Sequence, residues 1–534
     1  MKKLILFTIA ILLLSMLIIS GCQETATTKT TTAPSPTTTA PLAKTTAPPA
    51  AATTPAATAK PQYGGTLRII SSGGPLNIGY AAKQAFADSI DMIWSERIFE
   101  LATNGDLLPN LAESYDTSAD GKIITIHLKK GIKFQDGTDW NAKAGVWTFQ
   151  TCLNSGTLPD GKYIDSINVV DDYTIRVTLK QRNNKMIYGL TRMFHYSPTA
   201  FEKNGEEWAI NHAVSTAAFQ VIDFQRDITV KMKKFDSYWQ PNLPYLNEVE
   251  LRKVKDPAPC SAMMQAGQAD IWMSVPPLEA ADLRDKGYPT SSVPYFLNNI
   301  YPDSKNADSP FANKKVREAL EYAIDRPAVA KALGYGFQTA LNQLAPPGTQ
   351  GYNPNYVGRP YNPDKSKQLL AEAGYPSIKT KMMLQSTALD LATVIKNYLA
   401  AVGIEVEMDI ADPGRYWGAV NGGWKGLLLG VSANNPEYCI AWLDHFGPEP
   451  MMRFASMAKS PEYLALCDKV VQAPDIPSMR KLTMDMVTRA SEDVMAIPIT
   501  VTNNVMVVQK NVHTNYYKDV DSSYWRIFKD WLEK

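Results

Sequence analysis

Near residue 62 the composition of the chain changes abruptly, and this change limits where a folded domain can lie. Between Gln23 and Gln62 the residues are almost entirely Thr, Ala and Pro, with an occasional Lys. Such a segment has too few large apolar side chains to offset the conformational entropy that is lost on folding. We therefore expect residues 22–62 to form a disordered tether and the folded part to lie in residues 63–534.

The N-terminus carries the pattern of an export signal. Lys2 and Lys3 precede an unbroken apolar run, Leu4–Ile19, which is followed by Ser20-Gly21-Cys22. A basic start, an apolar middle and small residues at a cleavage point are typical of a signal peptide. An uncleaved anchor helix is the alternative, but the run is shorter than the roughly 20 residues that span a bilayer.

The end of this run resembles a bacterial lipobox. The resemblance implies that residues 1–21 are a lipoprotein signal peptide and that Cys22 is acylated and becomes the first mature residue. Two acyl chains on Cys22 would give stable anchoring.

Charge and cysteine content argue against several classes of protein. Lys and Arg number 54 against 53 Asp and Glu, so no strong positive field exists to attract nucleic acid. The five cysteines include no C-x-x-C pair, which argues against structural zinc and thioredoxin-like chemistry. Beyond Cys22 the others are either disulfide-bonded or buried thiols, namely Cys152, Cys260, Cys439 and Cys467.

Hydrophobic periodicity predicts a mixed α/β fold for residues 63–534. Apolar residues alternate with polar ones in some stretches and recur at helical spacing in others, and we find no repeat of solenoid period. The predicted strands are Ile124–Leu128, Ile175–Leu179 and Ile404–Ile410, and the predicted helices lie within 316–324, 362–374 and 391–403.

Five motifs, in order along the chain, resemble the extracytoplasmic solute-binding proteins of family 5. They are YGGTLRI (63–69), LLPNLAESYDTSADGKIITIHLKKGIKFQDGTDWNA (107–142), SYWQPNLPYLNEVELRKVKD (237–256), KKVREALEYAIDR (314–326) and YNPDKSKQLLAEAGY (361–375). The specificity of the resemblance lies in the number, order and spacing of the motifs. Members of this family deliver peptides, nickel chelates or oligosaccharides to ABC importers.

The resemblance implies an α/β, periplasmic-binding-protein-like fold of two lobes, of the large type II class, with an extra subdomain in the first lobe. The first lobe would comprise residues 63–268 and the returning segment 496–534, and the second lobe residues 269–495. Two segments would cross between the lobes, near 268–272 and near 497–501, and would form a hinge.

The resemblance also implies the function and the partners. We expect an extracytoplasmic, membrane-anchored, monomeric receptor that captures a peptide-like solute between its lobes and delivers it to an ABC permease. An oligosaccharide or a metal chelate is the alternative ligand, and a sensor that signals to a membrane receptor is the alternative role. An exported hydrolase on the same fold is a third class.

Candidate ligand contacts follow from the same comparison. In the loop GVSANNPEY (430–438), Asn434 occupies the position where peptide-binding members carry an aspartate that neutralises the ligand's ammonium group. An amide still accepts a hydrogen bond but supplies no counter-charge. The other candidates are polar or aromatic residues expected near the cleft, namely Asn298, Asn299, Trp272, Tyr416, Trp417, Trp424 and Trp442.

No motif predicts catalysis, a cofactor or a metal. The chain has no G-x-S-x-G, H-E-x-x-H, G-x-G-x-x-G or phosphate-binding loop pattern. His445, beside Asp444, is either a ligand contact or an ordinary surface or core histidine.

Overall fold

The computed structural model describes residues 60–84, 89–450, 452–517 and 524–534. Residues Lys60–Lys534 form one compact unit. The predicted signal peptide, Cys22 and nearly all of the predicted tether lie outside the described residues. Within the described part of the chain, no helix is both long and apolar enough to cross a membrane.

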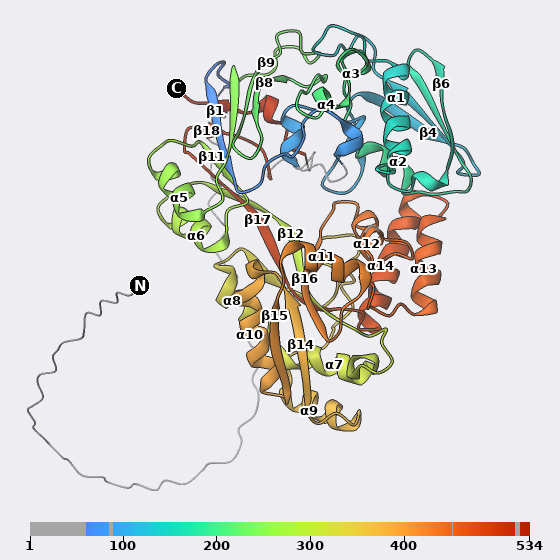
Figure 1. Cartoon of the computed structure of the whole chain (residues 1–534), viewed down its shortest axis with the longest axis vertical. Helices are drawn as coiled ribbons and strands as arrows, with labels where there is room; N and C mark the ends of the chain where they lie inside the picture. Colours follow the sequence, from blue (N-terminus) through green and yellow to red (C-terminus); the bar gives the residue numbers. More distant parts are fainter. Residues whose placement is uncertain (1–59, 85–88, 451, 518–523) are drawn as a thin grey trace, which may run out of the picture. The chain divides into compact units, whose positions relative to one another are not determined.

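One eleven-stranded sheet runs through the unit (Figure 1). In pairing order its strands are β15 (Ile404–Ile410), β14 (Ile378–Leu384), β16 (Leu427–Ala433), β12 (Thr290–Pro302), β17 (Ile497–Val508), β11 (Ile271–Met273), β1 (Thr66–Ser71), β10 (Glu248–Lys253), β9 (Thr229–Lys234) and β8 (Phe219–Gln225), with β13 (Gln338–Ala340) beside β17. We call the part with β1 and β8–β11 lobe 1 and the part with β13–β16 lobe 2.

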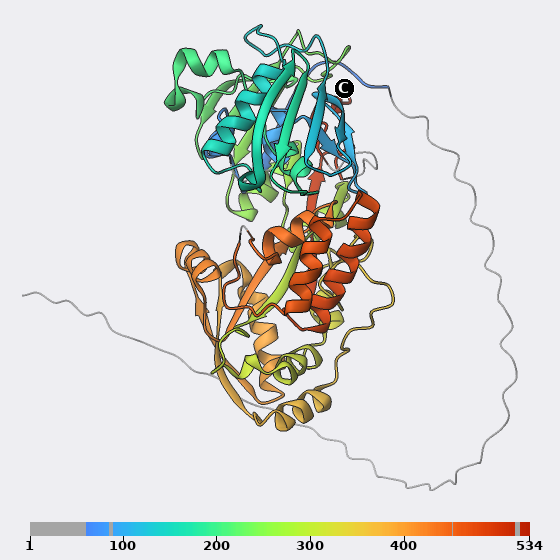
Figure 2. The same ribbon diagram turned by 90° about the vertical axis from the view of Figure 1, so that its right-hand side faces the viewer.

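The long strands β12 and β17 belong to both lobes, and we call this pair the ribbon (Figures 1 and 2). Residues 290–294 of β12 pair with 503–507 of β17 beside β11, and residues 296–300 pair with 497–502 beside β16. A register shift between Pro294 and Phe296 separates the two stretches. The predicted crossing near 497–501 lies within β17, whereas residues 268–272 lead into β11, on the lobe 1 side of the ribbon. The predicted lobe boundaries stay predictions, because ribbon residues pair in both lobes.

Lobe 1 contains a second, antiparallel sheet, as expected for an extra subdomain. Its strands pair in the order β4 (Ala112–Thr117), β5 (Ile123–Leu128), β7 (Thr174–Leu179) and β6 (Ile164–Asp171). The other elements of this lobe are β2 (Phe99–Leu101), β3 (Leu107–Pro109), α1 (Ala142–Asn154), α2 (Met186–Thr191), α3 (Pro198–Asn204), α4 (Glu206–Ala209), α5 (Pro257–Gln265), α6 (Pro277–Asp285), β18 (Val512–His513) and β19 (Trp531–Leu532).

Helices cover both faces of the sheet in lobe 2. One face packs against α7 (Lys314–Ala323), α8 (Arg326–Gly334), α9 (Pro363–Glu372) and α10 (Leu389–Ala400). The other face packs against α11 (Pro413–Gly422), α12 (Tyr438–Phe446), α13 (Pro461–Val471) and α14 (Ile476–Glu492).

Local sequence signals explain why several of these elements begin and end where they do. The Asn362 side chain accepts a hydrogen bond from the N–H of Lys365 at the start of α9, and Asp325 caps α8 through Ala328 in the same way. Gly374, just beyond α9, has φ +81°, a conformation that favours glycine. The predicted strands and helices are confirmed, but the helix of 316–324 begins at Lys314 and the helix of 391–403 begins at Leu389.

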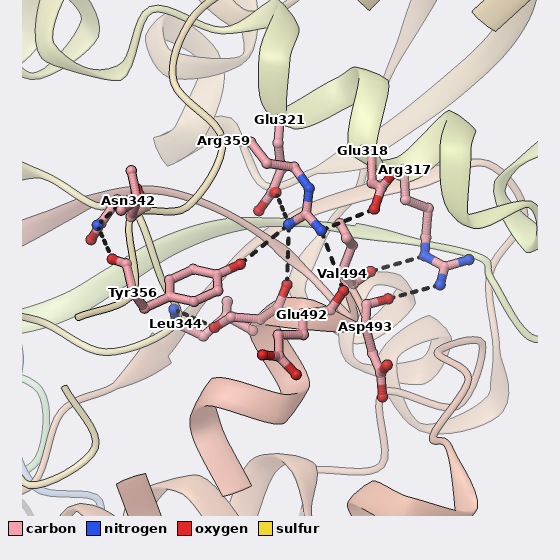
Figure 3. A network of polar contacts seen from close by, with 12 residues as sticks. Arg317, Glu318, Glu321, Asn342, Leu344, Tyr356, Arg359, Glu492, Asp493 and Val494 are labelled. Carbon is pink, nitrogen blue, oxygen red and sulfur yellow. Dashed lines mark hydrogen bonds and ion pairs between the residues drawn. The ribbon is translucent and has the colours of Figure 1, made fainter. Parts of the chain in front are cut away.

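A network of charged groups joins the end of α14 and the start of β17 to the helices of lobe 2 (Figure 3). Arg359 forms ion pairs with Glu321 and Glu318 at 2.7 and 3.0 Å. Arg317 donates to the carbonyl oxygens of Asp493 and Val494. Glu321 is only 2% exposed, so these bonds compensate the burial of its charge. The network therefore fixes the point from which β17 leaves lobe 2.

Candidate functional site

The parallel strands of the two lobes point their carboxyl ends toward each other. β14, β15 and β16 run parallel to one another and in the direction of β17, toward lobe 1. β1, β10 and β11 run in the opposite direction, toward lobe 2. Ligands of open α/β sheets bind at the carboxyl ends of parallel strands, so the loops at these opposed ends form the candidate site.

On the lobe 1 side, the loop after β1 is rich in small residues. It begins Ser72-Gly73-Gly74-Pro75 and borders a small depression that is also lined by Phe224, Ile228 and Lys253. Lys253 forms an ion pair with Asp227 at 2.5 Å.

On the lobe 2 side, Asn434 follows β16 and binds the ribbon. Its backbone N–H donates to the carbonyl oxygen of Tyr295 at 2.8 Å, and its Nδ2 donates to that of Pro294 at 3.1 Å. Its Oδ1 is buried and has no hydrogen-bond partner among the described residues. Asn434 is thus held beside the register shift between Pro294 and Phe296, and its Oδ1 can still accept a hydrogen bond.

One face of the sheet beside Asn434 carries both polar and exposed apolar groups. Asn298 lies opposite Val431 and Thr500 in the ladder, and its Nδ2 donates to the hydroxyls of Thr500 and Thr502 at 3.0 and 2.8 Å. Phe296, two residues away on the same face, is 42% exposed, and Val431 is 38% exposed. Sequence reasoning missed Phe296 and Val431, although the alternation within β12 and β16 could have indicated them.

Asn299 points to the opposite face and is fully buried. Its Nδ2 donates to Tyr301 Oη and Ser432 Oγ at 3.0 and 3.2 Å. Tyr416 lies on this face too, is 4% exposed and donates to the carbonyl oxygen of Leu429. Sequence reasoning had proposed both Asn298 and Asn299 as ligand contacts, but their side chains point to opposite faces of the sheet.

The predicted tryptophans fall into two groups. Trp417 is 37% exposed and contacts the edge of the Tyr416 ring at a centroid distance of 5.2 Å. Trp272, Trp424 and Trp442 are buried in apolar clusters. Trp424 Nε1 donates to the carbonyl oxygen of Tyr301, and Trp442 Nε1 donates to Tyr463 Oη. That these three contact a ligand stays a prediction.

Away from the ribbon, the lobes also meet at a polar contact. The β2–β3 turn places Asp106 2.9 Å from Arg480 of α14. Arg480 donates to Glu437 at 3.0 Å, and Tyr188 of α2 donates to the same carboxylate at 3.3 Å. Gly105 has φ +90°, and a Cβ there would lie 2.8 Å from Glu437 Oε2, so only glycine fits this turn.

A second part of this contact centres on Asp444 of α12. Arg192 and Lys185 bind its carboxylate at 2.7 and 3.2 Å. Asn184 donates to the carbonyl oxygens of Val471, the last residue of α13, and of Ala473, just beyond it. Both parts together, the residues around Glu437 and around Asp444, are called the polar contact below.

Glu437 in the polar contact and His445, beside Asp444, are shielded from water. Burial raises the pKa of Glu437, whereas Arg480 and hydrogen bonds act to lower it. Burial also lowers the pKa of His445, whose Nδ1 lies 2.7 Å from the carbonyl oxygen of Ala441. His445 is therefore a core histidine in this structure.

The described residues bear on the sequence expectations for metal ligands and for cysteine pairing. They contain no group of three or more His, Cys, Asp and Glu side chains that could hold a metal ion. Four buried cysteines are free thiols, namely Cys152, Cys260, Cys439 and Cys467. This resolves the alternative that the sequence left open.

Known proteins share both sequence and fold with this chain. Residues 106–442 match the model of the bacterial extracellular solute-binding proteins, family 5 Middle. The chain is 31% identical over 462 residues to the glutathione-binding protein GsiB of Shigella dysenteriae, covering 81% of this chain and 88% of that protein.

Two solved structures share the fold. One is the periplasmic binding protein DppA of Helicobacter pylori in complex with peptide STSA (TM-score 0.73, 22% identity, 89% of this chain and 99% of that one). The other is NikA of Brucella suis in complex with Fe(III)-EDTA (TM-score 0.77, 20% identity, 87% of this chain and 100% of that one). With these matches, the chain belongs to the family 5 bacterial extracellular solute-binding proteins, the substrate-binding proteins of ABC importers.

Proposed function

We propose that this chain captures a peptide-like solute between the opposed carboxyl ends of its two lobes and presents it to an ABC permease. The observation that carries the proposal is the juxtaposition of Asn434, with its unpartnered Oδ1, and the face formed by Asn298, Phe296 and Val431. Amide and hydroxyl groups suit the N–H and C=O groups of a peptide, and Phe296 and Val431 offer apolar contact to its side chains.

A peptide-like solute also agrees with the relatives. GsiB is named a glutathione-binding protein, and the DppA structure holds a peptide. Because Asn434 is neutral, the amino group of the solute donates a hydrogen bond to Asn434 Oδ1 here rather than forming an ion pair. Acetylating that amino group should then reduce affinity only modestly.

The chain performs no reaction in this role, acts as a monomer and binds no nucleic acid. It works outside the cytoplasm, held to the membrane by lipid on Cys22 and spaced from it by residues 22–62. Cys22→Ser should move the protein from the membrane fraction to the soluble fraction. Continued membrane association of that variant would contradict lipid anchoring.

Native mass spectrometry of the purified protein, followed by denaturation, tests the proposed ligand class. We expect denaturation to release a peptide or a mixture of peptides. The purified Asn434→Leu variant should carry less bound peptide than the purified Asn298→Ser variant. A single sugar or chelate mass would contradict the peptide assignment. A retained peptide that loses mass on incubation would contradict the absence of a reaction.

A further inference from the structure

Lobe 1 contains a cavity apart from the candidate solute site. It lies between the segment around residues 92–110 and the C-terminal segment, and has about 20 Å³ of room. Its polar lining comes from Ser95, Glu96, Arg97, Glu100 and Asn110, and Trp525 and Phe528 line it on the C-terminal side. A volume of this order admits a group the size of one water molecule.

Arg97 is the unusual member of the lining. It is 8% exposed, and its guanidinium carbon lies 4.4 Å from the ring centre of Phe194 and 5.0 Å from that of Tyr524. Its Nε is buried without a hydrogen-bond partner, and no described side chain forms an ion pair with it. By contrast, Arg317 and Arg359 of lobe 2 donate to several acceptors each.

The two carboxyl groups in the cavity lining, Glu96 and Glu100, bind other partners. Glu100 binds Arg526 at 2.6 Å. Glu96 accepts hydrogen bonds from Thr216, Tyr238 and Trp239, and burial raises its pKa to about 7. Lys129, 4.8 Å from the Trp239 ring, adds another cation nearby. Burying an unpaired cation is costly, so an acceptor in the cavity would stabilise the fold.

We propose that this cavity binds a small monovalent anion of the size of chloride through the guanidinium of Arg97. The anion would be distinct from the transported solute. Because Arg97 stacks on Tyr524, an anion bound to Arg97 would also help to hold the 92–110 segment against the C-terminal segment of lobe 1. A single-atom anion fits the available room better than a polyatomic one.

Bromide provides a direct probe, because its anomalous scattering locates it in crystals of the full chain soaked in sodium bromide. A peak within hydrogen-bonding distance of Arg97 is expected. The absence of such a peak would overturn the proposal and leave the cavity to water.

Thermal unfolding supplies a second, solution readout. At constant ionic strength, replacing sodium gluconate by sodium chloride should raise the midpoint of the wild type in a saturable way, by about 2 °C. Arg97→Gln should lose this shift, whereas Arg68→Gln, which removes an arginine paired with Asp270, should keep it. Equal shifts in the wild type and Arg97→Gln would overturn the proposal.

Sodium formate tests the size limit. A shift with formate as large as that with chloride would overturn the restriction to a single-atom anion. If Arg97→Gln fails to fold, Arg97→Lys, which keeps the positive charge, takes its place. The bromide peak and the chloride titration of the wild type still test whether the cavity binds an anion.

Discussion

The ribbon and the polar contact both join the two lobes, but they do so by different physics. The ribbon is a backbone ladder between β12 and β17, so it depends little on which side chains it carries. The polar contact consists of side-chain bonds around Glu437 and Asp444, which depend on charge. For the lobes to separate beside the polar contact, the bonds around Glu437 and Asp444 must break, whereas the backbone ladder of the ribbon need not.

The largest expected effect comes from interrupting the ribbon. Val505 is fully buried and its carbonyl oxygen accepts from Val275. Val505→Pro places a proline in a central strand and should lower the free energy of unfolding by at least about 3 kcal/mol. Urea denaturation measures this loss. Val505→Ala, which keeps the backbone N–H, should lose less, and equal losses would contradict the importance of the backbone ladder.

The next effect is the pH dependence of stability that Glu96 causes. It has to be measured first, because it overlaps any pH dependence that arises from Glu437 in the polar contact. Burial raises the pKa of Glu96 from 4.5 to about 7, so the folded state holds this proton more tightly than the unfolded state. Its contribution to stability is therefore complete below pH 4.5 and is lost as the pH rises through 7, by about 3 kcal/mol.

Glu96→Gln should flatten the dependence of unfolding free energy on pH between 5 and 7, and the exposed Glu113→Gln should not. Asp530, whose pKa burial raises to about 8, adds a similar loss at higher pH in both proteins. An unchanged slope in Glu96→Gln would contradict this assignment. The slope that remains in Glu96→Gln then reports on the other carboxyl groups, including Glu437.

A smaller effect is expected from breaking the polar contact. Arg480→Met removes the cation from Glu437, which is fully buried, and should cost about 2 kcal/mol of unfolding free energy. Adding Glu437→Gln should recover part of the loss, because no unpaired carboxylate then remains. Additive losses in the double variant would show that the two residues do not act together.

The smallest effect should come from the half-exposed tryptophan on lobe 2. Trp417→Ala should weaken solute binding about tenfold with little change in stability, as measured by calorimetry and thermal unfolding. The buried Trp442→Ala should instead lower stability. Unchanged affinity in Trp417→Ala would remove Trp417 from the site.

Sequence reasoning predicted local structure well because caps and periodicity act over a few residues. Asn362 and Asp325 cap the helices expected of them, and Ile404–Ile410 is a strand. The motifs also predicted the family and the two-lobe fold. The burial of Trp272 and Trp442 and the pairing of Asp106 with Arg480 were not predicted, because each depends on segments far apart in the sequence.

Hydrogen–deuterium exchange, with and without the solute that native mass spectrometry releases, tests most directly where the solute binds. The account predicts that saturating solute slows exchange at the opposed carboxyl ends, in residues 72–75, 385–388 and 434–437, while the ribbon core is equally protected in both states. Slower exchange confined to other surfaces, with these loops unchanged, would contradict it.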